Sequence, residues 1–346
     1  MPISQSITDA GPLQVQTTPG LTHTRVMVWL DRTGLPPWAI GVFCFIAMSF
    51  TAIITLIIAR VPDPDIYRNS VAFVAIISFF LGFYFRMGRG WHQDVLKILE
   101  FDPMLKSSLG IMEPTRTIVR IEIAVAIVAT GINLMFFSET FFDSTFFMFI
   151  LFVFYFVEYV TIIFCIDITF RQLAELGKIV EKIQINLLET DSYSTLANPM
   201  LRFVGLYIFG LCVITISFLI FTEGEYGFGR MMLIMSPWYL PGLLLMSLYM
   251  IPYNLFSKRM RVVKTLELNK VSGALRGNLS SLDNSLIASD QANLTKIDLL
   301  YYQDRIRKVR EWPFTDRLRA LILFGILPPL TWVIAAIIEI AIEGAL

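Results

Sequence analysis

Seven stretches of this chain are long and apolar enough to cross a lipid bilayer, and they limit its fold more than any other feature. A helix that spans the hydrocarbon core needs about 20 mostly apolar residues. Only 16% of the residues are charged, whereas about a quarter are charged in soluble domains. The chain is therefore expected to be a polytopic membrane protein. The stretches are 38–59, 70–87, 117–137, 145–170, 201–221, 231–256 and 320–342.

The expected fold is all-α, with seven transmembrane helices and a small cytoplasmic helical bundle. None of the segments between the stretches shows the alternating pattern of a strand. The second stretch is the shortest, and leaving it out gives a six-span alternative. The predicted units are an N-terminal tail, 1–37, spans one to six with their extensions, 38–257, a cytoplasmic helical segment, 258–319, and the last span with the C-terminus, 320–346.

The basic residues predict the orientation of the spans. With seven spans, 25 of the 28 lysines and arginines fall on one side of the membrane, and only Arg60, Arg68 and Arg230 fall on the other. Cytoplasmic segments carry such an excess of positive charge. The N-terminus is therefore expected in the cytoplasm and the C-terminus outside. Dropping the second span would flip everything before it and weaken this separation.

Several cytoplasmic segments carry apolar residues at helical spacing, which indicates amphipathic helices. Such helices need a partner for the apolar face, and a small bundle provides one. The alternative is that each stripe lies on the membrane surface. The stripes comprise Trp91, Val95, Ile98 and Leu99; Leu173, Leu176, Ile179, Val180, Ile183 and Leu187; and Ile297, Leu300 and Tyr301, with Ile306 and Val309 further along.

Glu158 is the most informative polar residue because it lies near the middle of the 145–170 span. Charged groups at this depth are costly and usually face a partner or a water-filled cavity. Glu158 either is a protonated group that hydrogen-bonds a neighbouring helix, or lines a path for protons, cations or a ligand. Asn133, in the outer half of the third span, is also expected to face protein.

Four charged residues fall near the inner ends of the third and fourth spans. The short connection SETFFDS makes these helices antiparallel neighbours, so Arg120 and Glu122 should meet Asp167 and Arg171. An Arg120–Asp167 ion pair is the simplest arrangement. Pairs at an interface are mostly structural, and this reading is preferred.

Prolines interrupt the last two spans and favour kinks there. The sixth contains Pro237, Pro241 and Pro252, and the seventh contains Pro328 and Pro329. A further break, Trp312-Pro313-Phe314, joins a charged helical segment to the last span. We expect a hinge at these residues, Trp312, Pro313, Phe314, Pro328 and Pro329, although proline is also ordinary in membrane helices.

The sequence contains none of the common enzyme signatures. There is no phosphate-binding loop, HExxH, GxSxG, kinase or dinucleotide motif, and no Cys/His spacing suggests a metal. No cofactor is indicated. The expected partners are the lipid bilayer and either a second copy of the chain or another subunit of a membrane complex, not nucleic acid.

The C-terminal stretch EWPFTDRLRALILFGILPPLTWVIAAIIE resembles the end of a group of uncharacterised bacterial multi-pass membrane proteins. In that group a Trp-Pro-Phe motif precedes a last span with an inner Pro, a Trp and a terminal Glu; here these are Trp312, Pro313, Phe314, Pro328, Trp332 and Glu339. The group usually has an acid directly after the Phe, whereas this chain has Thr315 and then Asp316. The resemblance implies a bacterial inner membrane and no particular activity.

Three functions compete at this stage. The first is a non-enzymatic channel-like or signalling protein whose cytoplasmic helices are coupled to the last span; its architecture is similar to that of insect-chemoreceptor-like channels. The second is a proton- or ion-coupled transporter that uses Glu158. The third is a structural subunit or scaffold of a membrane complex, with the cytoplasmic helices as its docking surface.

Overall fold

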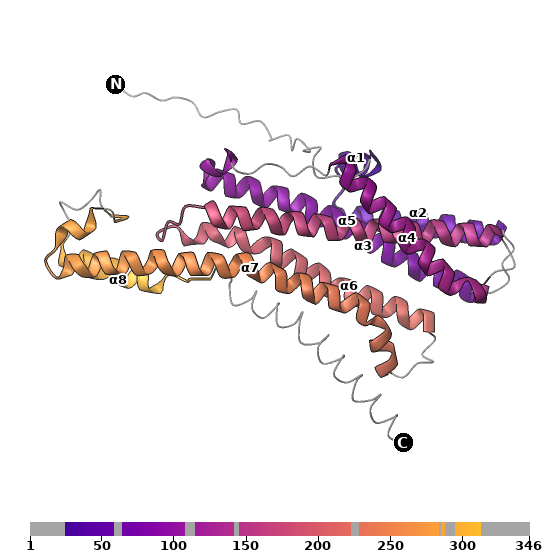
Figure 1. Cartoon of the computed structure of the whole chain (residues 1–346). Coiled ribbons are helices and arrows are strands. Elements are labelled where there is room, and N and C mark those ends of the chain that lie inside the picture. The colour runs from indigo at the N-terminus through magenta and orange to yellow at the C-terminus, as the bar shows by residue number, and fades with distance from the viewer. Residues whose placement is uncertain are drawn as a thin grey trace, which may run out of the picture.

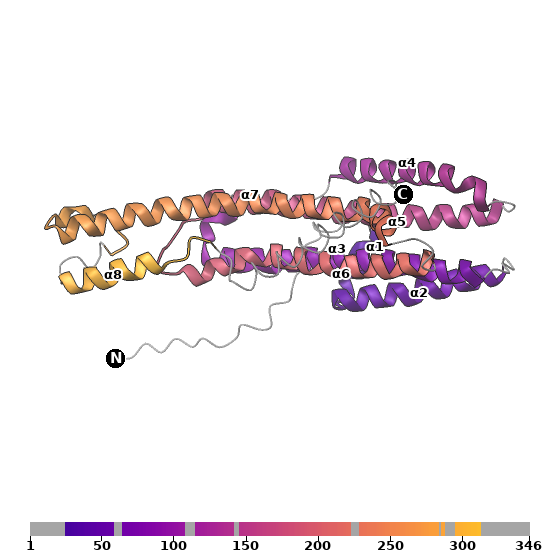
Figure 2. The same ribbon diagram turned by 90° about the horizontal axis from the view of Figure 1, so that it is seen from below.

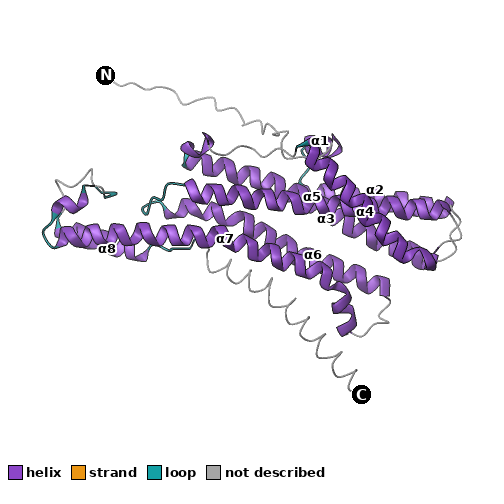
Figure 3. Cartoon of the chain, in the orientation of Figure 1, coloured by secondary structure: helices purple, strands orange, loops and turns teal. Residues whose placement is uncertain are grey.

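The computed structural model is all-helical, as the sequence predicts, with 89% helix and no strands among the residues that it describes (Figure 3). Those residues are 25–58, 64–107, 115–141, 145–222, 228–283, 285–287 and 295–312. The helices are α1 (Arg25–Arg32), α2 (Pro37–Ile58), α3 (Pro64–Phe101), η2 (Pro103–Ser107), α4 (Arg116–Phe141), α5 (Thr145–Lys182), η3 (Thr190–Ala197), α6 (Asn198–Thr222), α7 (Phe228–Leu275), η4 (Leu279–Leu282) and α8 (Lys296–Lys308).

Local sequence explains several helix ends. Pro37 and Pro64 occupy the first positions of α2 and α3, where the missing N–H costs nothing. Gly277, with a φ of +101°, follows the end of α7 and adopts a backbone conformation that other residues rarely reach. Thr295 and Asp298 form a capping box at the start of α8, in which each side chain accepts from the other residue's backbone N–H.

The helices form an elongated bundle in which α3 occupies the middle (Figures 1 and 2). α3 packs against α2, α5 and α6, and α4 packs along α5. α7 is the longest helix and packs against α5 and α6. At its C-terminal end, η4 and α8 fold back onto it. We call this the α8 end of the bundle.

Four described helical segments are long and apolar enough to cross a membrane, and each overlaps a predicted span. They are Pro37–Ile58, Ser70–Phe101, Phe152–Lys182 and Tyr193–Ser217. The second, Ser70–Phe101, overlaps the shortest predicted stretch and is the most buried of the four. The predicted spans 117–137 and 231–256 coincide with α4 and α7. The predicted span 320–342 lies outside the described residues.

Three helices continue well past the predicted ends of their spans. α3, α5 and α7 run to Phe101, Lys182 and Leu275 without a break, so the amphipathic segments continue the helices that contain the predicted spans, as predicted for α5 and α7. Their stripes are buried in one continuous core, which includes Trp91, Ile98, Leu176, Ile179, Val180 and Ile183. α1 is an element that the predicted tail did not include. It buries Met27 and Leu30.

The stripe predicted for the helix now seen as α8 is wrong in part. Ile297, Leu300 and Tyr301 are exposed, at 77%, 54% and 73% of their surface. The buried face instead consists of Leu299, Tyr302 and Ile306. The segment KIDLLYYQ has apolar residues on both sides of the helix, and contact with α7 selects the face that also brings the Tyr302 hydroxyl to a carboxylate.

Candidate functional site

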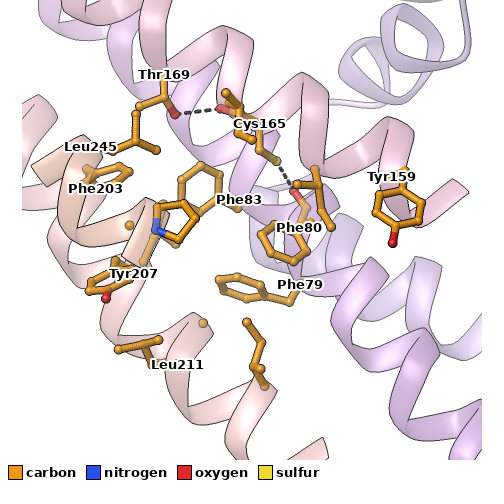
Figure 4. Close-up of a pocket in the computed structure, with 17 residues that line it drawn as sticks. Phe79, Phe80, Phe83, Tyr159, Cys165, Thr169, Phe203, Tyr207, Leu211 and Leu245 are labelled. Atoms are coloured by element: carbon orange, nitrogen blue, oxygen red, sulfur yellow. Dashed lines mark hydrogen bonds between the residues drawn. The ribbon is translucent and has the colours of Figure 1, made fainter. Parts of the chain in front are cut away.

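A cavity of about 380 Å³ lies between α3, α5, α6 and α7. Its walls are mostly aromatic and aliphatic, and Figure 4 shows the rings around it. α3 contributes Phe79, Phe80 and Phe83, and α6 contributes Phe203 and Tyr207. This volume lies near the lower end of the range of about 300–1,000 Å³ typical of small-molecule sites. The cavity is thus suited to a small apolar group.

Two glycines hold aromatic rings in the cavity wall. A Cβ on Gly210 would lie 2.7 Å from the Phe79 ring, and one on Gly242 would lie 2.0 Å from the Tyr207 ring. Both rings therefore rest directly on the backbone of a neighbouring helix. Besides Tyr159, the side of the cavity formed by α5 carries two polar groups that hydrogen-bond to carbonyls: Thr169 donates to Cys165 at 2.7 Å, and the Cys165 thiol donates to Phe80 at 3.1 Å.

A buried ion pair lies beyond the cavity toward the α8 end. Arg202 Nη2 on α6 donates to Asp94 Oδ2 on α3 at 2.6 Å, and Asn198 Nδ2 donates to Asp94 Oδ1 at 3.0 Å. The side chains of Arg202 and Asp94 are only 11% and 5% exposed. The guanidinium lies on Gly90, where a Cβ would be 2.1 Å from Cζ. The pair joins α3 to α6, a contact that the sequence did not predict.

Glu158 is buried on α5, at 4% exposure. Its carboxyl lies within interaction range of the hydroxyls of Tyr155 and Tyr159, its near neighbours in sequence. Tyr159 lines the cavity, whereas Glu158 is not among the described residues that line it. Asn133 lies within α4, and its side chain is outside the described part of the structure.

The predicted Arg120–Asp167 pair is not the pair that forms. Arg120 is exposed, and Asp167 pairs with Arg171, one turn further along α5. Glu122 is buried at 7% exposure and lies close enough for its charge to act on Arg171. The first part of α4 and the middle of α5 therefore bring charged groups together, with Arg171 rather than Arg120 as the cation.

Only one of the predicted hinge residues falls within the described chain. Trp312 is partly buried and packs against the core just after α8. Pro313, Phe314, Pro328 and Pro329 lie outside the described residues. In the sixth span, α7 continues through Pro237, Pro241 and Pro252 as one helix. Figure 1 shows a bend in its first part, the part that carries Pro237 and Pro241.

The joint between α7 and α8 centres on a buried carboxylate, Glu267, which is 3% exposed. It accepts from the Ser285 hydroxyl, from the Leu286 N–H at 3.0 Å and from the Tyr302 hydroxyl at 2.9 Å. Lys270 lies 3.4 Å away. We call these five residues the Glu267 joint. It ties α8 and the segment after η4 to the far end of α7.

Two further contacts extend the joint toward the last predicted span. Lys264 Nζ donates to the Val309 carbonyl at 2.8 Å, and Arg261 Nε pairs with Glu311 at 3.0 Å. The residues that follow α8 are therefore also held to α7, up to Glu311, the residue before Trp312. Sequence reasoning missed Glu267, although it interrupts an apolar stripe at four-residue spacing, between Val263 and Val271.

The Glu267 joint lies outside the predicted spans, and its hydrogen bonds favour the ionised carboxyl. Burial alone would raise the pKa of Glu267, but the hydrogen bonds from Ser285, Leu286 and Tyr302, with the nearby Lys270, bring that pKa below its ordinary value. Burial and the bond to Glu267 raise the pKa of Tyr302, so its hydroxyl remains a donor. The joint is fully formed at neutral pH.

In comparisons with protein-family models, curated proteins and solved structures, nothing matches this chain.

Proposed function

We propose that this protein is a non-enzymatic, channel-like or signalling membrane protein in which the α7–α8 unit controls the last predicted span. The observation that carries the proposal is the Glu267 joint. A helix that begins within the membrane-spanning part of the bundle runs unbroken to this joint, and α8 returns from it to Trp312. The last predicted span starts a few residues later.

The proposal supposes that a shift of α7 moves α8 as a unit and so pulls on the last span. Continuous helices and buried polar contacts transmit displacement because they have few alternative arrangements. The bend in the first part of α7 is a place where such a shift could begin. We further propose that the joint lies in the cytoplasm and that the protein lies in a bacterial inner membrane. The distribution of basic residues supports the first, and the C-terminal motif supports the second.

The orientation predicts a defined labelling pattern. In a background without the three native cysteines, single cysteines in place of Ser138 and Gly224 should react with a membrane-impermeant maleimide added to intact cells. A cysteine in place of Ser281, close to the Glu267 joint, should react only after the cells are opened. Labelling of Ser281→Cys in intact cells, with Gly224→Cys protected, would show the inverse orientation.

A transporter that uses Glu158 is the second candidate, favoured by the burial of this carboxyl among two tyrosines. Glu158→Gln keeps the shape and hydrogen-bonding capacity but removes the titratable group. If the residue is structural, this variant should retain wild-type stability and flux in proteoliposomes, and Glu158→Leu should lose about 1–3 kcal/mol of stability. Loss of flux in a stable Glu158→Gln variant would support the transporter instead.

The third candidate is a scaffold, for which the exposed face of α8, formed by Ile297, Leu300 and Tyr301, is a docking surface. A native mass measurement of the protein in nanodiscs separates the candidates. A channel lined by the last span should give a closed homo-oligomer. A monomer or dimer would support a transporter, and a retained second protein would support a scaffold.

A further inference from the structure

Three buried polar side chains lie next to the aromatic cavity, all on its side toward the α8 end. Gln172 follows the lining residue Thr169 by one turn of α5, and Tyr249 follows Leu245 by one turn of α7. Arg202 directly precedes the lining residue Phe203 on α6. Gln172 is 1% exposed and Tyr249 is 0% exposed.

These side chains keep unused hydrogen-bonding capacity. Both polar atoms of Gln172, the Tyr249 hydroxyl and Arg202 Nη1 are buried without a hydrogen-bond partner among the described residues. The Arg202 charge acts on the Tyr249 hydroxyl, and the Tyr249 ring packs 5.2 Å from that of Phe203, so at least these two groups adjoin each other. Buried polar atoms without partners are uncommon in folded proteins and each requires an explanation.

We infer that the cavity and these side chains form one binding site for a small amphipathic molecule with an acidic head. The apolar body would fill the aromatic cavity. The carboxylate would accept hydrogen bonds from Arg202 Nη1, the Gln172 amide and the Tyr249 hydroxyl. Arg202 already neutralises Asp94 through Nη2, so its second nitrogen can serve the ligand while the pair stays formed.

The hydrogen-bond donors of the polar side chains favour this class of ligand. An acyl chain of a bilayer lipid could fill an apolar cavity, but it would bring no acceptor to the three donors. A neutral alcohol would offer one weaker acceptor, whereas a carboxylate offers two oxygens with charge. The inference goes beyond the proposed function and holds whether or not the protein conducts ions.

Photolabelling of the full chain in phosphatidylcholine nanodiscs tests the inference. The probe is a medium-chain fatty acid that carries a diazirine, and the labelled peptides are mapped by mass spectrometry. Label should concentrate on the cavity segments of α3, α5, α6 and α7. Laurate should displace it about tenfold better than lauryl alcohol, because a charged hydrogen bond distinguishes the two.

Two gentle variants keep the test interpretable. Tyr249→Phe and Gln172→Leu remove only unpaired polar atoms, so they should fold at least as stably as the wild type. In each variant, displacement of the probe by laurate should weaken severalfold, whereas its displacement by lauryl alcohol should be unchanged. Leu245→Phe, in the cavity wall, should lower labelling by the probe in the presence of either competitor. Equal displacement of the probe by the acid and the alcohol would overturn the inference and indicate a lipid chain in the cavity. Label spread over lipid-facing helices, or crosslinks that place 313–346 in the cavity, would also overturn it.

Discussion

Asp94→Ala is expected to lower the free energy of unfolding by about 3–5 kcal/mol, because it leaves the Arg202 guanidinium buried without its counter-ion. The pair is 2.6 Å long, and its side chains are only 11% and 5% exposed. The Asn198 amide also loses its acceptor. Unfolding by sodium dodecyl sulfate titration in mixed micelles measures the change. The double variant Asp94→Leu/Arg202→Met should recover most of the loss, since an apolar pair needs no partner.

The chain contains a matched control for burial. Asp304 and Lys308 on α8 form a pair of the same length, 2.6 Å, but their side chains are 58% and 75% exposed. Asp304→Ala should therefore leave the free energy of unfolding almost unchanged. Similar losses for Asp94→Ala and Asp304→Ala would mean that burial does not set the strength of the α3–α6 contact.

Glu267→Ala is expected to release α8 from α7. The substitution removes the acceptor for the Ser285 and Tyr302 hydroxyls and for the Leu286 N–H. Ser285 and Tyr302 are buried, and each unsatisfied buried donor costs about 1–3 kcal/mol. Hydrogen exchange of α8 should become much faster, while α3 and α6 should keep their protection. Tyr302→Phe should show part of the effect. Tyr301→Phe, at an exposed neighbouring position, should leave the hydrogen exchange of α8 unchanged. If Glu267→Ala also left the exchange of α8 unchanged, the role of the joint would be refuted.

The pH dependence of the joint follows from the lowered pKa of Glu267. The group is more acidic in the folded protein than its ordinary value of 4.5, so its contribution to stability is fully present above that value. The contribution should decline as the pH falls below 4.5 through the lowered folded pKa. Exchange of α8 should therefore be constant between neutral pH and about pH 5, after correction for intrinsic rates, and rise only in stronger acid.

The sequence predicted the helices well because apolar periodicity is a local property. The stripe Leu176, Ile179, Val180 and Ile183 repeats at helical spacing over several turns, and α5 continues as expected. In α8, adjacent apolar residues from Leu299 to Tyr302 support two faces equally, and only the position of Glu267 on another helix decides between them. Periodicity alone could not supply this information.

One site contact is local to a single helix, whereas the cavity depends on tertiary arrangement. The sequence allowed Asp167 to pair with Arg120 or with Arg171. It pairs with Arg171, one turn along the same helix, because the helix itself fixes the distance between these two residues. The cavity draws residues from four helices, and neither Gly210 nor Gly242 differs in sequence from an ordinary membrane glycine. Only the packed helices show that an aromatic ring rests on each.

Coupling between the Glu267 joint and the last span is tested most directly by cysteine accessibility. A single cysteine replaces Ala336, in the last predicted span, and its alkylation by a water-soluble maleimide is timed in nanodiscs. The rate should change severalfold when Glu267→Ala is added, and it should stay the same when Tyr301→Phe is added. An unchanged rate in Glu267→Ala, in a sample whose hydrogen exchange shows α8 released, would contradict the coupling.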